Sequence, residues 1–214
     1  MTVTLKNLPR RAMLTPDKGA AVEVEQLGRG RYTIAWRSVA NPSAVYLQVR
    51  DVDKSKELLS RLEGPHIPKL EYCGQFEAEE TLYLTQFYAP LTAKNKAAWN
   101  VYKVLSRYAE QAYRQNQPQS YGRQEPLNVQ RVNEDFASMV EEDDELPQSI
   151  REDVRALVSW SCSYGDYMVE IAKRNLAVDG ETLILLDPVF DQAEVVRTNR
   201  EATKRAERRN LYAR

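Results

Sequence analysis

The chain has 214 residues, of which 43% are hydrophobic and 29% charged, and its formal net charge is -1. These values are typical of a globular protein with one large domain or two small lobes, and they do not favour nucleic-acid binding. Two cysteines, Cys73 and Cys162, and one histidine, His66, exclude a disulfide framework and a His-rich metal site, and argue against a Ser-His-Asp triad. Without an apolar signal core or an apolar run of about 18 residues, the expected location is a cytoplasm, with no membrane contact.

The first half of the chain has the pattern of strands. We expect residues 1–20 to be a partly ordered lead-in and residues 22–50 to form three antiparallel strands, because period-two alternation is interrupted by LGRGR and NPS. Residues 51–63 have helical spacing, with Asp51 or Asp53 as the N-cap and Gly64-Pro65 as the stop. Two further strands at 69–76 and 81–88 complete a predicted five-stranded antiparallel sheet.

The second half changes to helical patterning near residue 92. Residues 95–114 predict a long helix whose apolar face consists of Trp99, Tyr102, Val104, Leu105 and Tyr108. The chain then continues with a polar loop at 114–126 and an acidic cluster at 141–145. These are followed by a predicted helix over 150–168, capped by Ser149, and a charged helical tail at 192–214. The expected class is therefore α+β, with a strand-rich lobe over 1–91 and a helical lobe over 92–214.

A glycine-rich turn, LGRGRYTIA at residues 27–35, lies between two predicted strands. Gly28 and Gly30 allow the backbone to approach a ligand, so that its N–H groups can face phosphate oxygens. Tyr32 at the tip could cover the phosphates, and Ala35 could pack under a purine. Taken alone, the motif also fits an ordinary hairpin turn.

A second hairpin, residues 175–190, runs NLAVDGETLILLDPVF with its turn at Asp179-Gly180. It places Asn175 before one strand and Asp187 after the other, where both side-chain oxygens could reach one Mg²⁺ ion. The alternative is that Asp187 only caps the Asp-Pro turn. Between the two hairpins, residues 82–91 join a strand to the long helix, and around Phe87 and Ala89 this linker could offer backbone groups to an adenine edge.

The order of these features resembles that of protein kinases: glycine hairpin, third strand, helix, two strands, linker, helices and an Asn-to-Asp hairpin. Over residues 22–190 the chain is most similar to the small early serine/threonine protein kinases of T7-like bacteriophages. The segments that carry this resemblance are LGRGRYTIA at 27–35, GPHIPKLEY at 64–72 and DPVF at 187–190.

The resemblance implies ATP and Mg²⁺ as cofactors and host proteins as substrates, in the cytoplasm of a bacterial host. It implies nucleotide contacts and a metal site made by Gly28, Gly30, Tyr32, Thr33, Ala35, Phe87, Ala89, Asn175 and Asp187. Thr33 occupies the position of the last glycine. Glu170 stands at the catalytic aspartate position, five residues before Asn175, and Lys173 lies where some kinases place a phosphate-facing lysine.

The sequence also departs from the family. Gln48 occupies the position of the lysine that grips the α/β-phosphates, and Arg50, two residues on, is a candidate substitute. No His-Arg pair precedes Glu170, which could instead be part of an ordinary solvated helix end. The glutamate that would pair with the missing lysine is Glu57 or Glu63. The 27 residues after Asp187 leave room only for a reduced helical lobe.

Two functions stay open from the sequence. One is an active kinase, monomeric or weakly oligomeric, that phosphorylates Ser or Thr of host proteins. The other is a pseudokinase that binds a host protein through the acidic cluster at 141–145 or through the basic tail. A different phosphotransferase or an unrelated interaction domain is the remaining alternative.

Overall fold

The computed structural model describes residues 11–17, 20–30, 32–50, 55–76, 80–117, 127–164 and 167–192. The chain forms two compact units, of which unit 1 comprises Met1–Glu63 and Ile67–Pro90. Unit 2 comprises Gly64–His66 and Leu91–Arg214. The tail at 193–214 and most of the loop predicted at 114–126 lie outside the described residues.

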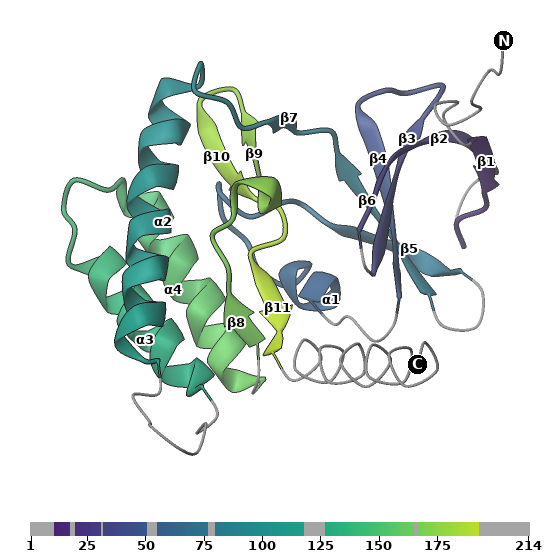
Figure 1. Cartoon of the computed structure of the whole chain (residues 1–214). Helices are drawn as coiled ribbons and strands as arrows, with labels where there is room; N and C mark the ends of the chain where they lie inside the picture. Colours follow the sequence, from purple (N-terminus) through teal and green to yellow (C-terminus); the bar gives the residue numbers. More distant parts are fainter. Residues whose placement is uncertain are drawn as a thin grey trace, which may run out of the picture. The chain divides into compact units, whose positions relative to one another are not determined.

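Unit 1 is built on a six-stranded antiparallel sheet in the order β1-β2-β3-β4-β6-β5 (Figure 1). Its strands are β1 (Arg11–Leu14), β2 (Val22–Arg29), β3 (Thr33–Ser38), β4 (Ala44–Arg50), β5 (Glu71–Phe76) and β6 (Glu80–Gln86). The antiparallel sheet is confirmed, but the prediction of five strands was wrong by one. β1 lies in the predicted lead-in, and it pairs with β2 because Leu14 is buried in the core of this sheet.

The sheet curls so that its two edge strands approach each other. The Asp17 N–H, just after β1, donates to the Cys73 carbonyl of β5 over 2.9 Å. Gly74 has a positive φ of 127°, and a Cβ added there would lie 2.2 Å from the Asp17 carboxyl carbon. The inside of the curl is filled by a core cluster drawn from five strands: Leu14, Val24, Trp36, Tyr46 and Leu82. One face of the sheet is therefore a packed interior.

Helix α1 (Ser55–Leu59) follows β4 and is shorter than predicted. Residues 51–54, including the predicted caps Asp51 and Asp53, lie outside the described residues. The helix ends before Glu63 because Leu62 N–H bonds to the Leu59 carbonyl in a tighter turn. The two-residue strand β7 (Ala89–Pro90) ends unit 1.

Unit 2 contains three long helices: α2 (Lys96–Gln115), α3 (Val129–Glu141) and α4 (Gln148–Ser163). Helices were predicted in the regions of α2 and α4, whereas α3 was not predicted. Helix α3 packs against both α2 and α4. The side of α2 that is fully buried consists of Ala98, Leu105 and Ala112, so the aromatic face predicted for this helix was only partly right. No helix within the described ranges is both long and apolar enough to span a membrane.

Helix α4 differs from its prediction at both ends. Its N-cap is Pro147, and the hydroxyl of Ser149 contacts the His66 ring instead of capping the helix. The helix ends at Ser163, and Met168 belongs to the short strand β8 (Tyr167–Val169), which pairs with β11 (Val189–Asp191). The stretch predicted as one helix over 150–168 is therefore divided between a helix and a buried strand.

The predicted Asn-to-Asp hairpin is present in unit 2. It consists of β9 (Leu176–Asp179) and β10 (Thr182–Leu185), with Gly180 at a positive φ of 59° in the turn. The 3₁₀ turn η1 (Lys173–Asn175) leads into β9, and α2 packs against β10. Because β9 and β10 are almost entirely buried, the hairpin fixes the residues at its open end.

Candidate functional site

Three residues predicted for catalysis or metal binding are joined by hydrogen bonds at the open end of the β9–β10 hairpin. Glu170, Asn175 and Asp187 form what we call the Glu170 cluster. The Asp187 N–H donates to the Asn175 carbonyl over 3.1 Å, and the Glu170 N–H donates to the Pro188 carbonyl over 2.7 Å. These backbone bonds bring together residues up to 17 positions apart in the sequence.

The side chains of this cluster are oriented by further hydrogen bonds. Asn175 Nδ2 donates to Glu170 Oε2 over 2.8 Å, and Arg174 donates to Glu170 Oε1 over 2.8 Å. Because the nitrogen of the Asn175 amide points to Glu170, its Oδ1 is directed away from that bond. Glu170 is one-third exposed and lies in a loop after β8, so its interpretation as an ordinary helix end was wrong.

Whether the cluster could bind Mg²⁺ depends on the oxygen ligands that its side chains offer. Within the described ranges, no group of three or more His, Cys, Asp or Glu side chains is arranged to hold a metal ion. Asn175 and Asp187 supply one amide and one carboxylate oxygen function. Mg²⁺ commonly takes one or two carboxylates and fills its other positions with phosphate oxygens and water. The residues present therefore fit a magnesium ion that arrives with a phosphate ligand.

Lys173 has a contact that the sequence did not indicate. Its ammonium nitrogen lies 5.1 Å from the ring centroid of Trp99 on α2, which is a cation–π arrangement. The next residue, Arg174, has a side chain that is 75% exposed apart from its bond to Glu170. Arg174 was not predicted as a site residue, although its i,i+4 spacing from Glu170 could have identified it.

The nucleotide-binding residues predicted in unit 1 divide between the two faces of the sheet. In the β3–β4 pairing Ala35 lies opposite Leu47, and Ile34 lies opposite Gln48. Cross-strand partners share a face and successive residues alternate, so Ala35 and Gln48 point to opposite faces. Gly28 and Thr33 share the Ala35 face, whereas Arg50 shares the Gln48 face.

Gln48 and Arg50 lie on the side of the sheet that carries the core cluster, where Gln48 is half-buried and Arg50, at the end of β4, is exposed. Gln48 Oε1 accepts from Trp36 Nε1 over 2.8 Å, and Gln48 Nε2 donates to Glu80. Arg50 lies 3.9 Å from the other oxygen of Glu80. We call these four residues the Gln48 network. One ligand on the Ala35 face cannot also contact Gln48 or Arg50, so the structure does not place either where a phosphate-gripping lysine on that face would stand.

The β4 residues on the Ala35 face are apolar, which explains why no replacement cation is found there. Leu47 and Val49 occupy that face, and Val49 is only 2% exposed. Thr85 of β6, opposite Val45, also lies there; it is 8% exposed and its hydroxyl has no partner. Sequence reasoning missed Thr85, although a threonine among the apolar positions of a strand was a visible signal.

The glycine turn is a hairpin, and both of its glycines have ordinary φ values. Gly30 N–H donates to the Thr33 carbonyl over 2.7 Å, so that donor is already used within the turn. A Cβ added at Gly28 would meet no atom within 4 Å. Arg50 N–H donates to the Tyr32 carbonyl, and in the linker Phe87 N–H donates to the Ser43 carbonyl. Ala89 is exposed in β7.

The predicted αC-type glutamates have ordinary surroundings. Glu57 pairs with Arg61 over 2.7 Å at i,i+4 spacing, and Glu63 is exposed. The neighbouring Lys56 is 3% exposed and engaged in an interaction. In α1 it is therefore the lysine, and not a glutamate, that is buried.

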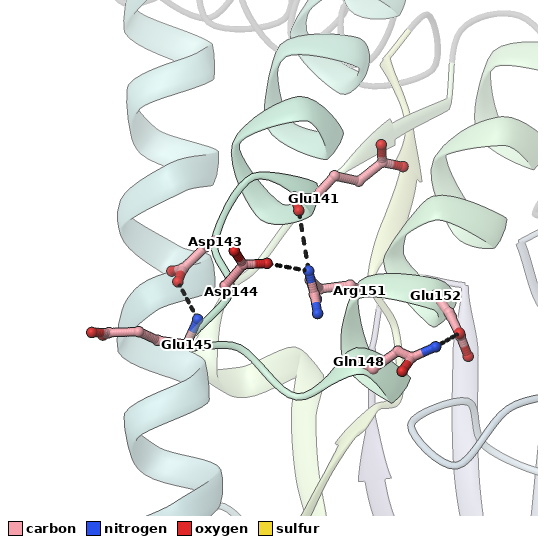
Figure 2. Close-up of polar contacts among 7 residues, drawn as sticks. All are labelled: Glu141, Asp143, Asp144, Glu145, Gln148, Arg151 and Glu152. Atoms are coloured by element: carbon pink, nitrogen blue, oxygen red, sulfur yellow. Dashed lines mark hydrogen bonds and ion pairs between the residues drawn. The ribbon is translucent and has the colours of Figure 1, made fainter.

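The acidic segment 141–145, expected to be a partner-binding surface, is partly neutralised by two arginines of α4, of which Figure 2 shows Arg151. Arg151 donates to the Glu141 carbonyl over 3.4 Å and to Asp144 over 3.0 Å, and Arg155 pairs with Glu141. The pocket between these residues is lined by both signs of charge: Glu141, Gln148, Arg151, Glu152 and Arg155. The segment therefore has less free negative charge than its sequence indicates.

The sole histidine anchors the segment Gly64–His66 within unit 2. His66 N–H donates to Asp153 Oδ2 over 2.7 Å, and Nδ1 donates to the Leu183 carbonyl over 2.7 Å. Nε2 lies 3.0 Å from Ser149 Oγ and accepts a hydrogen bond from that hydroxyl. Burial raises the pKa of Asp153, and its bond from the His66 N–H opposes that rise. Both ring nitrogens have partners, so this histidine has a structural role.

No family model matches the chain, and no curated protein is significantly similar to it.

Proposed function

We propose that this chain is a protein-kinase-like phosphotransferase that transfers the γ-phosphoryl of ATP to Ser or Thr of host proteins. The observation that supports it most is the Glu170 cluster, in which Glu170, Asn175 and Asp187 are linked by hydrogen bonds at the end of the hairpin. Such a set is what phosphoryl transfer needs from a protein, because positioning and charge neutralisation supply most of the catalysis.

In the proposed reaction, each residue of the Glu170 cluster has one role. The acceptor hydroxyl oxygen forms a bond to the γ-phosphorus, the bond from that phosphorus to the bridging oxygen breaks, and ADP leaves. Glu170 receives the hydroxyl proton, and its bonds to Arg174 and Asn175 hold the carboxylate in position. Asp187 and the Asn175 amide oxygen are the candidates to hold Mg²⁺, which would neutralise charge on the phosphates.

The Ala35 face of unit 1 provides what the proposal needs for a purine. It combines the small side chain of Ala35 with open space over Gly28. We propose that the adenine is bound through this face and that Gln48 and Arg50 take no part in its binding.

The Gln48 network favours a second candidate, a pseudokinase that binds nucleotide and acts by contacting a host protein. The Gln48 amide already has partners for both its oxygen and its nitrogen, and β4 presents no cation on the Ala35 face. A missing phosphate-gripping lysine weakens the transition state more than the ground state. Binding without turnover is the outcome that this candidate predicts.

One experiment separates the two candidates from each other and from an unrelated domain. ATP affinity is measured by calorimetry with and without Mg²⁺, and transfer is followed with γ-labelled ATP and bacterial protein extract. Mg²⁺-dependent binding with label in protein supports the kinase, and binding without label supports the pseudokinase. If ATP does not bind, or binds equally without Mg²⁺, the proposed nucleotide site is wrong.

A further inference from the structure

One face of helix α2 carries a line of positive charge. Lys96, Lys103, Arg107 and Arg114, which we call the α2 cation stripe, are all exposed. Spacings of seven, eleven and eighteen residues return to within about 20° of one direction at 3.6 residues per turn. The buried residues Ala98, Leu105 and Ala112 lie on the opposite side of the helix. The stripe therefore points directly away from the core of unit 2.

The cations of the stripe are mostly without acidic partners. Arg114 pairs with Glu110 over 2.5 Å. Lys96, Lys103 and Arg107 make no ion pair with any described residue, although Arg107 lies 5.0 Å over the ring of Tyr108. Like charges at i,i+4, as in Lys103 and Arg107, destabilise a helix by a few tenths of a kcal/mol. A chain with 30 basic and 31 acidic residues has thus gathered unpaired cations along one line.

The start of the stripe is linked to the Glu170 cluster through Lys173. Trp99 lies three residues after Lys96 and four before Lys103, which makes both lysines its neighbours on the helix surface. The Lys173 ammonium lies 5.1 Å from the Trp99 ring centroid, and Lys173 is two residues before Asn175. At 1.5 Å per residue, the stripe extends about 27 Å from Lys96 to Arg114.

We infer that the α2 cation stripe binds an acidic segment of the acceptor protein, whose hydroxyl is then presented to Glu170. The second part of this inference, presentation of the hydroxyl to Glu170, rests on the proposed function. Spaced carboxylates of an extended segment would match cations that are themselves about 6 to 11 Å apart along the helix. Lys173 and Arg174 continue the positive charge from the helix to the cluster.

A protein segment fits this surface better than a nucleic acid. The Tyr108 hydroxyl, on the same helix, donates to Asp143 over 2.9 Å, and the neighbouring Asp144 side chain is 95% exposed. These carboxylates border the middle of the stripe. The dense phosphate charge of a nucleic acid would be repelled there, whereas a peptide can carry its carboxylates only where the cations lie.

The test measures binding of a labelled Ser-containing peptide rich in Asp and Glu to the full chain by fluorescence anisotropy. Comparison ligands are the same peptide with Asn and Gln at the acidic positions, and a single-stranded oligonucleotide. We expect the acidic peptide to bind best and to weaken with salt, because exposed ion pairs are screened. K103E/R107E should weaken it about tenfold or more at low salt, since two attractive contacts become repulsive.

The matched control is R131E, which reverses an exposed arginine on α3 outside the stripe. It should change peptide affinity less than about twofold, as expected for an exposed charge outside the stripe. Circular dichroism checks the fold of each variant. If K103E/R107E unfolds, K103Q/R107Q is measured in its place. Equal binding of the acidic and amide peptides, or unchanged affinity in the stripe variant, would overturn the inference. Tighter binding of the oligonucleotide would overturn it in favour of a nucleic-acid partner.

A transfer assay with the same peptides separates the inference from the proposed function. If both hold, the acidic peptide has the lower KM, and K103E/R107E raises that KM while kcat is largely kept. If acidic-peptide binding depends on the stripe but no peptide is ever phosphorylated, the docking surface stands and the kinase proposal fails. If peptides are phosphorylated without preference for acidic residues, the kinase proposal stands and the docking inference fails.

Discussion

The Gln48 network and the Glu170 cluster are both sets of hydrogen-bonded polar residues, but they differ in how much of their hydrogen-bonding capacity remains available to a ligand. In the network, the Gln48 amide is used at both ends, by Trp36 and Glu80, on the packed interior face of unit 1. In the cluster, Glu170 remains one-third exposed, and the Asn175 bond to it engages only the amide nitrogen. A satisfied interior network stabilises a fold, whereas a partly exposed cluster retains capacity for a ligand.

The largest expected effect is that of Asp187→Ala. Removal of the carboxylate should abolish the Mg²⁺ dependence of ATP binding and reduce any phosphoryl transfer by about a hundredfold or more, as loss of a metal's charge stabilisation costs several kcal/mol. Calorimetry and the labelled-ATP assay measure both. Asp179→Asn, at the turn end of the same hairpin, is the matched control and should behave as the parent does. Equal behaviour of the two variants would place the metal elsewhere.

Glu170→Gln should leave ATP affinity nearly unchanged, because Gln can still accept the Asn175 bond through its oxygen. It should reduce transfer by about 10²–10⁴-fold, the usual contribution of a positioned proton acceptor. Single-turnover kinetics with bound Mg-ATP measure the step directly. Transfer at the parent rate would show that Glu170 only positions Arg174 and Asn175.

Gln48→Leu tests the role of the Gln48 network. It removes the acceptor of the Trp36 indole N–H and one donor to Glu80, so we expect the free energy of unfolding to fall by about 1–3 kcal/mol. ATP affinity should stay at the parent value, which opposes the sequence-based assignment of Gln48 to the nucleotide. Urea unfolding and calorimetry provide the two measurements, and Gln75→Leu, at an exposed position of β5, is the control. A loss of ATP affinity without a loss of stability would show that Gln48 contacts the nucleotide.

The smallest effect concerns Asp153, whose pKa is raised by burial against the opposing bond from His66 N–H. Because the folded state holds this proton to higher pH, its contribution to stability is greatest at low pH and is lost as pH rises through the folded pKa. Asp153→Asn can keep the His66 bond through its oxygen, and we expect it to remove this falling component from the pH dependence. Thermal unfolding from acid to neutral pH would show it, with Glu134→Gln as the exposed control. An unchanged pH profile would mean that Asp153 does not titrate in this range.

The sequence predicted the parts of the fold that local patterning controls. Alternating β-branched residues indicated the strands, and Asp179-Gly180 indicated the hairpin turn. That hairpin joins the Asp187 N–H to the Asn175 carbonyl, and the approach of their side-chain oxygens stays a prediction. The strand β1 was missed because its stability depends on pairing with β2 and closure near Cys73, which are long-range contacts. Ser149 was taken for a helix cap because its partner, His66, is 83 residues away in sequence.

The candidate site was only half predictable for a related reason. Assignment of Gln48 to a ligand depended on which face of β4 it occupies, and a shift of one residue in strand alignment reverses the face. That register is set by pairing with β3 and β6, which the spacing of motifs does not encode. The Glu170 cluster lies in a short loop and hairpin, where sequence distance and spatial distance agree more closely.

The membership of Gly64–His66 in unit 2 has a consequence for how the protein is made. The Leu185 N–H donates to the His66 carbonyl, and a Cβ on Gly64 would lie 1.9 Å from an Asp153 oxygen, so these three residues fit closely among later ones. During synthesis at about 5–20 residues per second, their partners emerge on the order of ten seconds later. A fragment that starts at residue 91 would leave the buried Asp153 without its donor, so unit 2 should not fold well when it is cut from the rest of the chain.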